Sequence, residues 1–351
     1  MRGVVFLGER KLELMNFPDP TPGPGEVVLE IKASGMCGSD LKFYRPNKEE
    51  SLKALGLGEI SEPLIAGHEP CGVVVARGAG VDAALAPDGA RVMVHHYKGC
   101  GHCEHCRVGW QQLCREVPVK VFGATGHGAH AAFMLVPAST LVALPDDLSF
   151  ETGAAISCGT GTAYGALQRV GLTGRDTIAI FGQGPVGLSA VQFANAMGAR
   201  AIALDTVAER RELARGLGAD AVIDPAADNP VEALKELTAG RGVDIALDCS
   251  GAEAGRLAAI RATRTWGTVG FVGEGGQVTI DVSKDMIRKQ LTIIASWTFS
   301  AFGQADCARF VAERGIDVDH LFTQQYHTLD EAEAAYRLFD TQTTGKGVFL
   351  L

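Results

Sequence analysis

The sequence predicts an α/β protein in which a doubly wound parallel sheet is joined to a β-rich domain. Two observations lead to this class. Short apolar runs alternate with helical patterns over residues 177–297, whereas short strands separated by proline and glycine fill residues 1–155. Strand–helix alternation favours a parallel sheet with right-handed crossovers, and closely spaced strands with turn residues favour an antiparallel one. A length of 351 residues is enough for two domains.

The expected parallel strands are short and almost continuously apolar, as in strands that are buried on both faces. They cover residues 177–181, 200–205, 220–224, 244–251, 267–273 and 291–297. Helices are expected between them. One covers residues 186–197 and can end at Gly198, and another begins with Asn229 as its cap and Pro230 in its first turn.

The first part of the chain has the pattern of antiparallel β structure. Its N-terminal segment has only a short apolar stretch, broken at residues 8–10, so we interpret it as a strand rather than a signal peptide. Two helices are expected after Trp297, and the second begins with a capping box formed by Thr328 and Glu331. A strand pattern follows over residues 345–351 and could return to the first domain.

Composition excludes several classes of partner. The net charge of -9 and the pI of about 5.5 argue against nucleic acid and against an anionic membrane surface. No apolar run approaches the roughly 18 residues of a membrane-spanning helix. The nine cysteines are odd in number and four are clustered, which favours metal sites in a reducing compartment over a disulfide framework. We therefore expect a cytoplasmic protein that binds neither nucleic acid nor membrane.

Four cysteines have the spacing C-x2-C-x2-C-x7-C. They are Cys100, Cys103, Cys106 and Cys114. Four thiolates within fifteen residues can complete a tetrahedral shell around one zinc ion and leave no open position for chemistry. An iron–sulfur cluster is an alternative, although the C-x7-C end does not match ferredoxin spacing, and the thiols could also be free. The spacing therefore predicts a structural zinc site.

A glycine-rich turn follows the expected strand at 177–181 and opens a helix. It contains Gly182, Gly184, Pro185, Val186 and Gly187. Glycines at these places allow a tight turn and let a pyrophosphate approach the helix N-terminus. Asp205 ends the next strand, where a carboxylate accepts hydrogen bonds from a ribose 2′-hydroxyl and repels a 2′-phosphate. The turn predicts NAD in preference to NADP, although Arg210 and Arg211 could accommodate the phosphate, and the alternative is a turn that binds nothing.

Three further residues form a set suited to a catalytic metal. A catalytic zinc has about three protein ligands and one open position. Cys37 and His68 supply two candidates, and Cys158, near the junction of the expected domains, supplies a third. Each is an ordinary loop or core residue when taken alone. Together with the four-cysteine loop and the glycine turn, they predict a zinc ion in the cleft between the domains, within reach of a nicotinamide.

Taken in order along the chain, these motifs resemble the zinc-dependent medium-chain alcohol and polyol dehydrogenases. The resemblance covers essentially the whole chain and rests on Cys37-Gly-Ser39-Asp40, Gly67-His68-Glu69, the four-cysteine loop, Cys158 and GQGPVG. It implies a GroES-like catalytic domain formed by residues 1–157 and 298–351, and a Rossmann domain at 158–297. It also implies two zinc ions per subunit, NAD-linked oxidation of an alcohol to a ketone or aldehyde, and a homodimer or homotetramer.

The resemblance assigns the metal site residue by residue. Cys37, His68 and Cys158 match the ligands of a catalytic zinc ion, which acts as a Lewis acid on the alcohol oxygen. Glu69 matches an acidic neighbour that serves as a ligand or as a ligand-exchange partner.

The proton relay is assigned in the same way. Ser39 matches the hydroxyl that begins the relay, and Asp40 matches the residue that holds the ligand histidine in one tautomer. Lys42 departs from the pattern, because some members have a histidine there that completes the relay. An amine with an ordinary pKa near 10.4 is a poor relay base unless it is buried.

The identity of the alcohol is left open. Secondary alcohols and polyols are favoured, and aromatic primary alcohols and amino-alcohols remain. We interpret residues 43–60 either as a lid over the substrate pocket or as a surface insertion. Two other functions stay as alternatives: a metal-independent reductase, which the complete set of Cys37, His68 and Cys158 disfavours, and a non-catalytic dinucleotide-binding protein.

Overall fold

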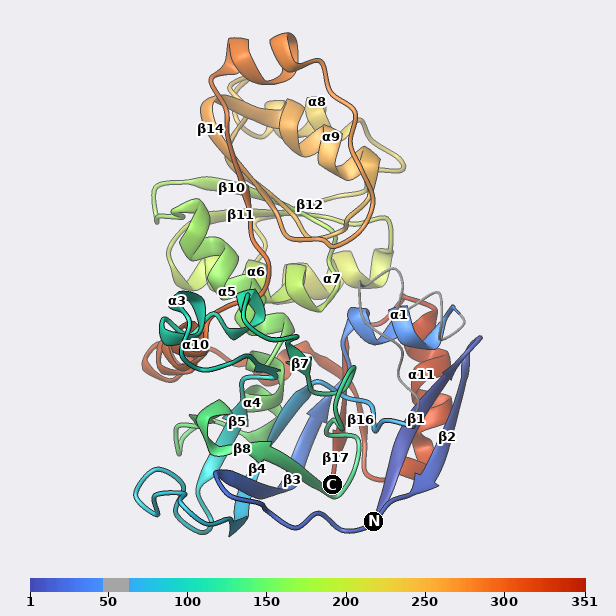
Figure 1. Ribbon diagram of the computed structural model, residues 1–351. Helices are drawn as coiled ribbons and strands as arrows, with labels where there is room; N and C mark the ends of the chain where they lie inside the picture. Colours follow the sequence, from blue (N-terminus) through green and yellow to red (C-terminus); the bar gives the residue numbers. More distant parts are fainter. Residues whose placement is uncertain (47–62) are drawn as a thin grey trace. The chain divides into compact units, whose positions relative to one another are not determined.

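The computed structural model describes residues 1–46 and 63–351, and the chain divides into two compact units (Figure 1). The first unit comprises Met1–Gly161, Phe299–Gln342 and Lys346–Leu351, and the second comprises Thr162–Thr298 and Thr343–Gly345. Most of the lid or insertion predicted over residues 43–60 lies outside the described residues.

The second unit is built on a six-stranded parallel sheet with the strand order β12-β11-β10-β13-β14-β15. Its strands are β10 (Thr177–Phe181), β11 (Arg200–Leu204), β12 (Ala221–Ile223), β13 (Val243–Asp248), β14 (Thr263–Phe271) and β15 (Thr292–Ala295). The strand order runs outward from β10 in one direction and from β13 in the other. This arrangement confirms the predicted doubly wound fold.

Helix α5 (Gly159–Val170) precedes β10, and helices separate most of the strands as the sequence predicted. These helices are α6 (Pro185–Ala196), α7 (Ala208–Gly216), α8 (Pro230–Glu236) and α9 (Glu253–Ala262). Asn229 caps α8, because its side-chain oxygen accepts hydrogen bonds from the backbone N–H groups of Val231 and Glu232. Gly198 follows α6 with a φ of +84°, a conformation that a side chain disfavours. Apolar residues of α8 and α9 pack with those of the strands into one core cluster.

The first unit is built on a seven-stranded sheet in which β16, β17, β3, β4, β5 and β9 follow in order and β8 pairs with β3. These strands are β3 (Glu26–Gly35), β4 (Glu69–Arg77), β5 (Arg91–Val94), β8 (Phe133–Pro137), β9 (Leu141–Ala143), β16 (Phe322–Tyr326) and β17 (Lys346–Leu350). The predicted antiparallel structure holds except that β16 and β17 are parallel. Strand β17 pairs with β3, so the late segment does return to the first unit.

Smaller elements complete the first unit. Two hairpin-like pairs are β1 (Arg2–Gly8) with β2 (Lys11–Asn16), and β6 (Tyr97–Lys98) with β7 (Lys120–Val121). The helices are η1 (Gly38–Asp40), α1 (Leu41–Tyr44), α3 (Glu104–Arg107), η2 (Gln111–Leu113), η3 (Ala138–Thr140), α4 (Phe150–Ile156), α10 (Ala301–Arg314), η6 (Val318–Leu321), η7 (Leu329–Glu331) and α11 (Ala332–Asp340). The capping box of Thr328 and Glu331 is present at η7, just before α11.

Two apolar clusters hold the first unit together. One fills the interior around β3, β4 and β8 and contains Leu29, Val74 and Met134. The other joins α11 to β1, α1 and β17 and contains Tyr336 and Phe349. In the part of the chain that the structure describes, no helix combines the length and apolarity needed to cross a bilayer.

Candidate active site

The three predicted metal ligands come together in the first unit. Cys37 follows β3, His68 precedes β4, and Cys158 lies between α4 and α5. Antiparallel pairing of Gly35 with Glu69 brings the ends of β3 and β4 together and therefore brings Cys37 to His68. One side-chain atom of each ligand lies within 4.8 Å of the others, and the two sulfurs are 3.8 Å apart. All three side chains are buried.

Ser39 and Asp40 lie against this set as the resemblance implied. The Asp40 carboxylate is 2.9 Å from His68 Nδ1 and also accepts a hydrogen bond of 2.9 Å from the Cys37 backbone N–H. The Ser39 hydroxyl lies 2.9 Å from the other ring nitrogen, Nε2, and donates to Cys37 Sγ at 3.2 Å. The Nδ1 atom of His68 is thus occupied by Asp40, and Nε2 is turned to the sulfurs and to a half-buried hydroxyl.

The electrostatics of the set favour a cation. A hydrogen bond from Cys158 lowers the pKa of Cys37 well below its ordinary value, against the opposing effect of burial. Burial by itself lowers the pKa of His68, but Asp40 and Cys37 raise it well above its ordinary value. The lowered pKa of Cys37 favours a buried thiolate beside the His68 ring, and this negative charge suits a bound cation. Two sulfurs and a nitrogen with this charge balance suit zinc.

Both carboxylate oxygens of Glu69 have partners outside the set of three candidate ligands. Its Oε1 accepts a hydrogen bond of 3.2 Å from the Gly159 N–H, and its Oε2 pairs with the ammonium of Lys346 on β17. That ammonium also donates to the Met36 carbonyl at 3.2 Å. Burial raises the pKa of Glu69 to about 8, although Lys346 opposes the shift. The Glu69–Lys346 pair therefore links residues adjacent to each of the three candidate ligands. Direct metal ligation by Glu69 stays a prediction.

Lys42 lies on α1, half-buried, a short distance along the chain from Asp40. Its place in a proton relay also stays a prediction.

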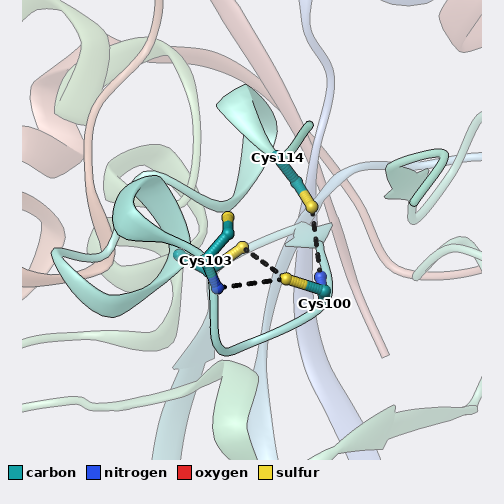
Figure 2. Close-up of side chains that lie close together, drawn as sticks. Cys100, Cys103 and Cys114 are labelled. Carbon is teal, nitrogen blue, oxygen red and sulfur yellow. Dashed lines mark hydrogen bonds between the residues drawn. The ribbon is translucent and has the colours of Figure 1, made fainter. Parts of the chain in front are cut away.

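The four clustered cysteines form a second group of suitable metal ligands, also in the first unit. Their sulfurs lie within 4.8 Å of one another. Figure 2 shows Cys100, Cys103 and Cys114 directed toward a common centre. Backbone N–H groups donate to these sulfurs, among them Cys103 N to Cys100 Sγ and Cys100 N to Cys114 Sγ, both at 3.3 Å. The bond from Cys100 N lowers the pKa of Cys114 to about 6. Donors aimed at sulfur stabilise thiolates, which are the form that zinc binds.

The predicted glycine turn lies between β10 and α6 in the second unit. Gly182 has a φ of +89°, and a Cβ atom on Gly187 would lie 1.9 Å from the Gly182 carbonyl oxygen. Both positions therefore require glycine. Gly184 caps α6, with Pro185 in the first turn and Val186 after it, and a Cβ atom on Gly184 would meet nothing within 4 Å. Space at the helix N-terminus is what a pyrophosphate needs.

A cavity of about 600 Å³ lies beside this turn. Its lining includes Gly182, Asp205, Asn229, Ser250 and Arg261. Asp205 is 8% exposed, and its carboxylate accepts hydrogen bonds from the N–H groups of Gln183 at 2.6 Å and Val207 at 2.8 Å. The carboxylate thus fixes the turn as well as facing the cavity. The cavity has the size and position of an adenosine site.

The two arginines after Asp205 differ. Arg211 pairs with Asp224 at 3.0 Å and donates to the Asp205 carbonyl at 2.8 Å. Arg210 is buried and donates through Nε to the Thr344 carbonyl at 3.0 Å. Its Nη2 has no hydrogen-bond partner among the residues that the structure describes.

Comparison with known proteins agrees with this geometry. Residues 185–313 match the zinc-binding dehydrogenase family, and residues 23–146 match the alcohol dehydrogenase GroES-like domain. The chain belongs to the zinc-type alcohol dehydrogenase family. The predicted family and enzyme class, and the predicted zinc and NAD cofactors, are thereby confirmed.

Two relatives and one solved structure illustrate the likeness. An uncharacterized zinc-type alcohol dehydrogenase-like protein, YphC of Escherichia coli K12, is 38% identical over 99% of this chain and 98% of its own length. An L-threonine 3-dehydrogenase of Pyrococcus horikoshii is 32% identical over 97% of this chain and 95% of its own. The solved alcohol dehydrogenase of Thermus sp. ATN1 superimposes with a TM-score of 0.87 at 28% identity, covering 100% of this chain and 99% of that one.

Three residues that surround the candidate ligands Cys37, His68 and Cys158 were missed in the sequence. Lys346 pairs with Glu69, Tyr336 donates to Asp40, and His130 contacts Tyr336. A lysine at the start of an apolar strand could have suggested a buried partner. Tyr336 and His130 lie in stretches that have the pattern of ordinary core helices and strands. Nothing in the sequence therefore indicated the hydrogen bonds that their polar atoms make.

Proposed function

We propose that this dehydrogenase oxidises the secondary hydroxyl of a small alcohol or polyol with NAD, giving a ketone. The observation that carries the proposal is the convergence of Cys37, His68 and Cys158, with the Ser39 hydroxyl at the open nitrogen of His68. We assign these three side chains as the ligands of the catalytic zinc, and the four-cysteine loop as the holder of a structural zinc.

Each neighbouring group has one task in this proposal. Zinc would polarise the alcohol oxygen and NAD would accept the hydride. The hydroxyl proton would leave through Ser39, whose side chain lies against both Cys37 and His68 and which would take up this proton while it releases its own toward solvent. Asp40 keeps the proton of His68 on Nδ1, so that Nε2 presents its lone pair to the metal.

The units divide these tasks. We propose a catalytic domain of residues 1–157 and 298–351 and an NAD-binding domain of residues 158–297; the division of the chain into two compact units, the first of which extends to Gly161, supports this proposal. The glycine turn and the cavity at Asp205 support the cofactor role of the second. A homodimer or homotetramer follows from family membership and is proposed on that ground.

The preference for a secondary hydroxyl is supported by the relatives. The substrate in the name L-threonine 3-dehydrogenase carries its hydroxyl on a secondary carbon. Polyols present the same group and are the second candidate class. A metal-independent reductase is disfavoured because it would not need three buried metal-ligating side chains whose ligand atoms lie within 4.8 Å of one another.

A panel of matched alcohols tests the substrate class. We expect NADH formation to be faster with L-threonine than with L-serine, or with 2-propanol than with ethanol, because each pair differs in secondary against primary hydroxyl. Sorbitol and other polyols complete the panel. Faster oxidation of the primary member in every pair would contradict the proposal.

Metal analysis tests the site assignment. The purified protein should retain two zinc ions per chain, and Cys37→Ser should retain one. A wild-type content of one persistent ion, or of iron, would contradict the two-site assignment.

A further inference from the structure

Asp40 is held from three directions. It accepts hydrogen bonds from the Cys37 backbone N–H, from His68 Nδ1 and from the hydroxyl of Tyr336, each at 2.9 Å. The first two donors belong to the ligand segments. The third comes from α11, a helix that contributes no ligand to the proposed metal site. Asp40 is 1% exposed, so no water competes for these bonds.

The bonding continues behind Tyr336 into the interior of the first unit. The Tyr336 hydroxyl lies 2.6 Å from His130 Nε2, and His130 Nδ1 lies 2.7 Å from the Ser34 hydroxyl. Tyr336, His130 and Ser34 are all 0% exposed. The result is a buried row of four side chains, Ser34–His130–Tyr336–Asp40, drawn from β3, the segment before β8, α11 and η1.

The direction of each hydrogen bond follows from the chemistry of the partners. A carboxylate only accepts, so Tyr336 gives its single proton to Asp40 and its oxygen accepts from His130 Nε2–H. Burial lowers the pKa of His130 to about 4, so the ring is neutral at pH 7 and its Nδ1 carries a lone pair. Ser34 therefore donates to Nδ1. Every proton in the row points toward Asp40, and so does the Nδ1 proton of His68.

Packing alone does not account for these polar atoms. Tyr336 lies in the apolar cluster of α11, with the Phe6 ring 4.8 Å away and Phe349 beside it. A phenylalanine would fill the same space, and a buried hydroxyl costs free energy unless it is hydrogen-bonded. The hydroxyl of Tyr336 is bonded on both sides, and both bonds lie on the path to Asp40.

We infer that Tyr336, supported by His130 and Ser34, is a positioning residue for the dehydrogenase reaction, which fixes the Asp40 carboxylate and through it the metal-binding ring of His68. The inference rests on the proposed assignment of Cys37, His68 and Cys158 as ligands. A carboxylate bonded from three separate segments cannot rotate without leaving a buried donor unpaired. The His68 ring therefore keeps Nε2 directed at the metal position.

The test is the release of zinc from the holoenzyme of Tyr336→Phe. This change removes one oxygen and keeps the ring. We expect about tenfold weaker retention of one zinc ion per chain against a graded chelator, the lower end of the 10–100-fold effect of such partners. The other zinc ion should be retained as in the wild type. The value of kcat should fall while the KM for NAD is unchanged.

Tyr44→Phe is the matched control. Its ring packs 5.7 Å from that of Tyr336 in the same cluster, and its hydroxyl lies outside the row. It should retain both zinc ions like the wild type. Ser34→Ala, at the far end of the row, should weaken retention by a smaller factor, and the double variant with Tyr336→Phe should be no weaker than Tyr336→Phe alone, because the row is already cut.

The outcomes separate the inference from the proposed function. If Cys37→Ser lowers the zinc content by one ion but Tyr336→Phe and Ser34→Ala release zinc like the wild type, only the positioning role is wrong. If Cys37→Ser leaves the zinc content unchanged, the ligand assignment itself is wrong. If Tyr336→Phe does not fold, Ser34→Ala alone decides the positioning role by the same measurement. Equal losses of zinc from Tyr44→Phe and Tyr336→Phe would show that Tyr336 acts only through packing.

Discussion

At the scale of single residues, Ser39 is the side chain at which we propose that proton transfer begins. Its hydroxyl contacts both the Cys37 sulfur and the Nε2 atom of His68. The next basic side chain along the chain, Lys42, lies on α1. These positions allow the first proton acceptor and the later relay to be tested separately.

Ser39→Ala should lower kcat by about 10²–10⁴-fold, the usual value of one positioned proton-transfer group. The loss should shrink as pH rises, because the alkoxide then forms with less help. A pH–rate profile with one good alcohol measures this, with zinc content and NAD affinity as controls for the site.

Lys42→Ala is the companion variant and should lower kcat less than Ser39→Ala does, since an ammonium is a poor base. A larger loss in Lys42→Ala than in Ser39→Ala would place the start of the relay at the lysine.

We propose that Asp205 selects between the two nicotinamide cofactors. Its carboxylate is fixed by Gln183 and Val207 and cannot turn away from a 2′-phosphate without breaking these bonds. We expect kcat/KM to be higher with NAD than with NADP, and Asp205→Ser to lower the ratio of the NAD value to the NADP value, because the substitution removes the carboxylate that repels a 2′-phosphate. A wild-type ratio of one or below would contradict the role of Asp205.

At the scale of elements, we propose that the two cysteine sites have different roles, one structural and one catalytic. The four-cysteine loop has little regular structure besides α3 and η2, and its sulfurs are held by its own backbone N–H groups. The ligands Cys37, His68 and Cys158 are instead attached to β3, β4 and α4, which are stabilised by the sheet and the core.

Cys103→Ser should therefore lower the melting temperature, because loss of a structural ligand removes folding free energy. Cys37→Ser should abolish turnover and change the melting temperature much less. Thermal unfolding of both variants, alongside NADH formation, makes the comparison. Equal decreases in melting temperature would show that the two sites do not differ in this way.

Contiguous patterns were predictable from the sequence, whereas contacts between distant segments were predictable only where motifs indicated them, as for Cys37, His68 and Cys158. The strand at 177–181, the Asn229 cap and the Thr328–Glu331 capping box all depend on neighbours in the chain, and the structure has them. The bond from Tyr336 to Asp40 joins residues 296 positions apart. No periodicity or spacing in the sequence predicts such a bond, since it depends on how α11 packs against the rest of the first unit.

At the scale of the whole molecule, buried histidines make stability depend on pH. His95 is 0% exposed, and burial lowers its pKa to about 4. In the unfolded chain the pKa of histidine is about 6.5. The unfolded state therefore binds more protons between these values, and stability falls as pH decreases from about 6.5 toward 4.

His95→Leu should make the free energy of unfolding less dependent on pH. The wild type should lose about 2 kcal/mol of unfolding free energy between pH 7 and pH 5 through this one group, and the variant should not. Urea unfolding at both pH values in zinc-saturated buffer measures the difference. His320→Leu changes a histidine that is 75% exposed and serves as the control; an equal effect of both substitutions would contradict the role of burial.

The position of β17 sets an order of events during synthesis. On the ribosome the earlier parts of a chain emerge and begin to fold first. The four-cysteine loop needs only fifteen contiguous residues, so it can take up its ion while translation continues. The Cys37 site is supported by Lys346, whose ammonium joins Glu69 to the Met36 carbonyl. We therefore expect the proposed catalytic ion to be loaded late, after β17 has emerged and inserted between β16 and β3.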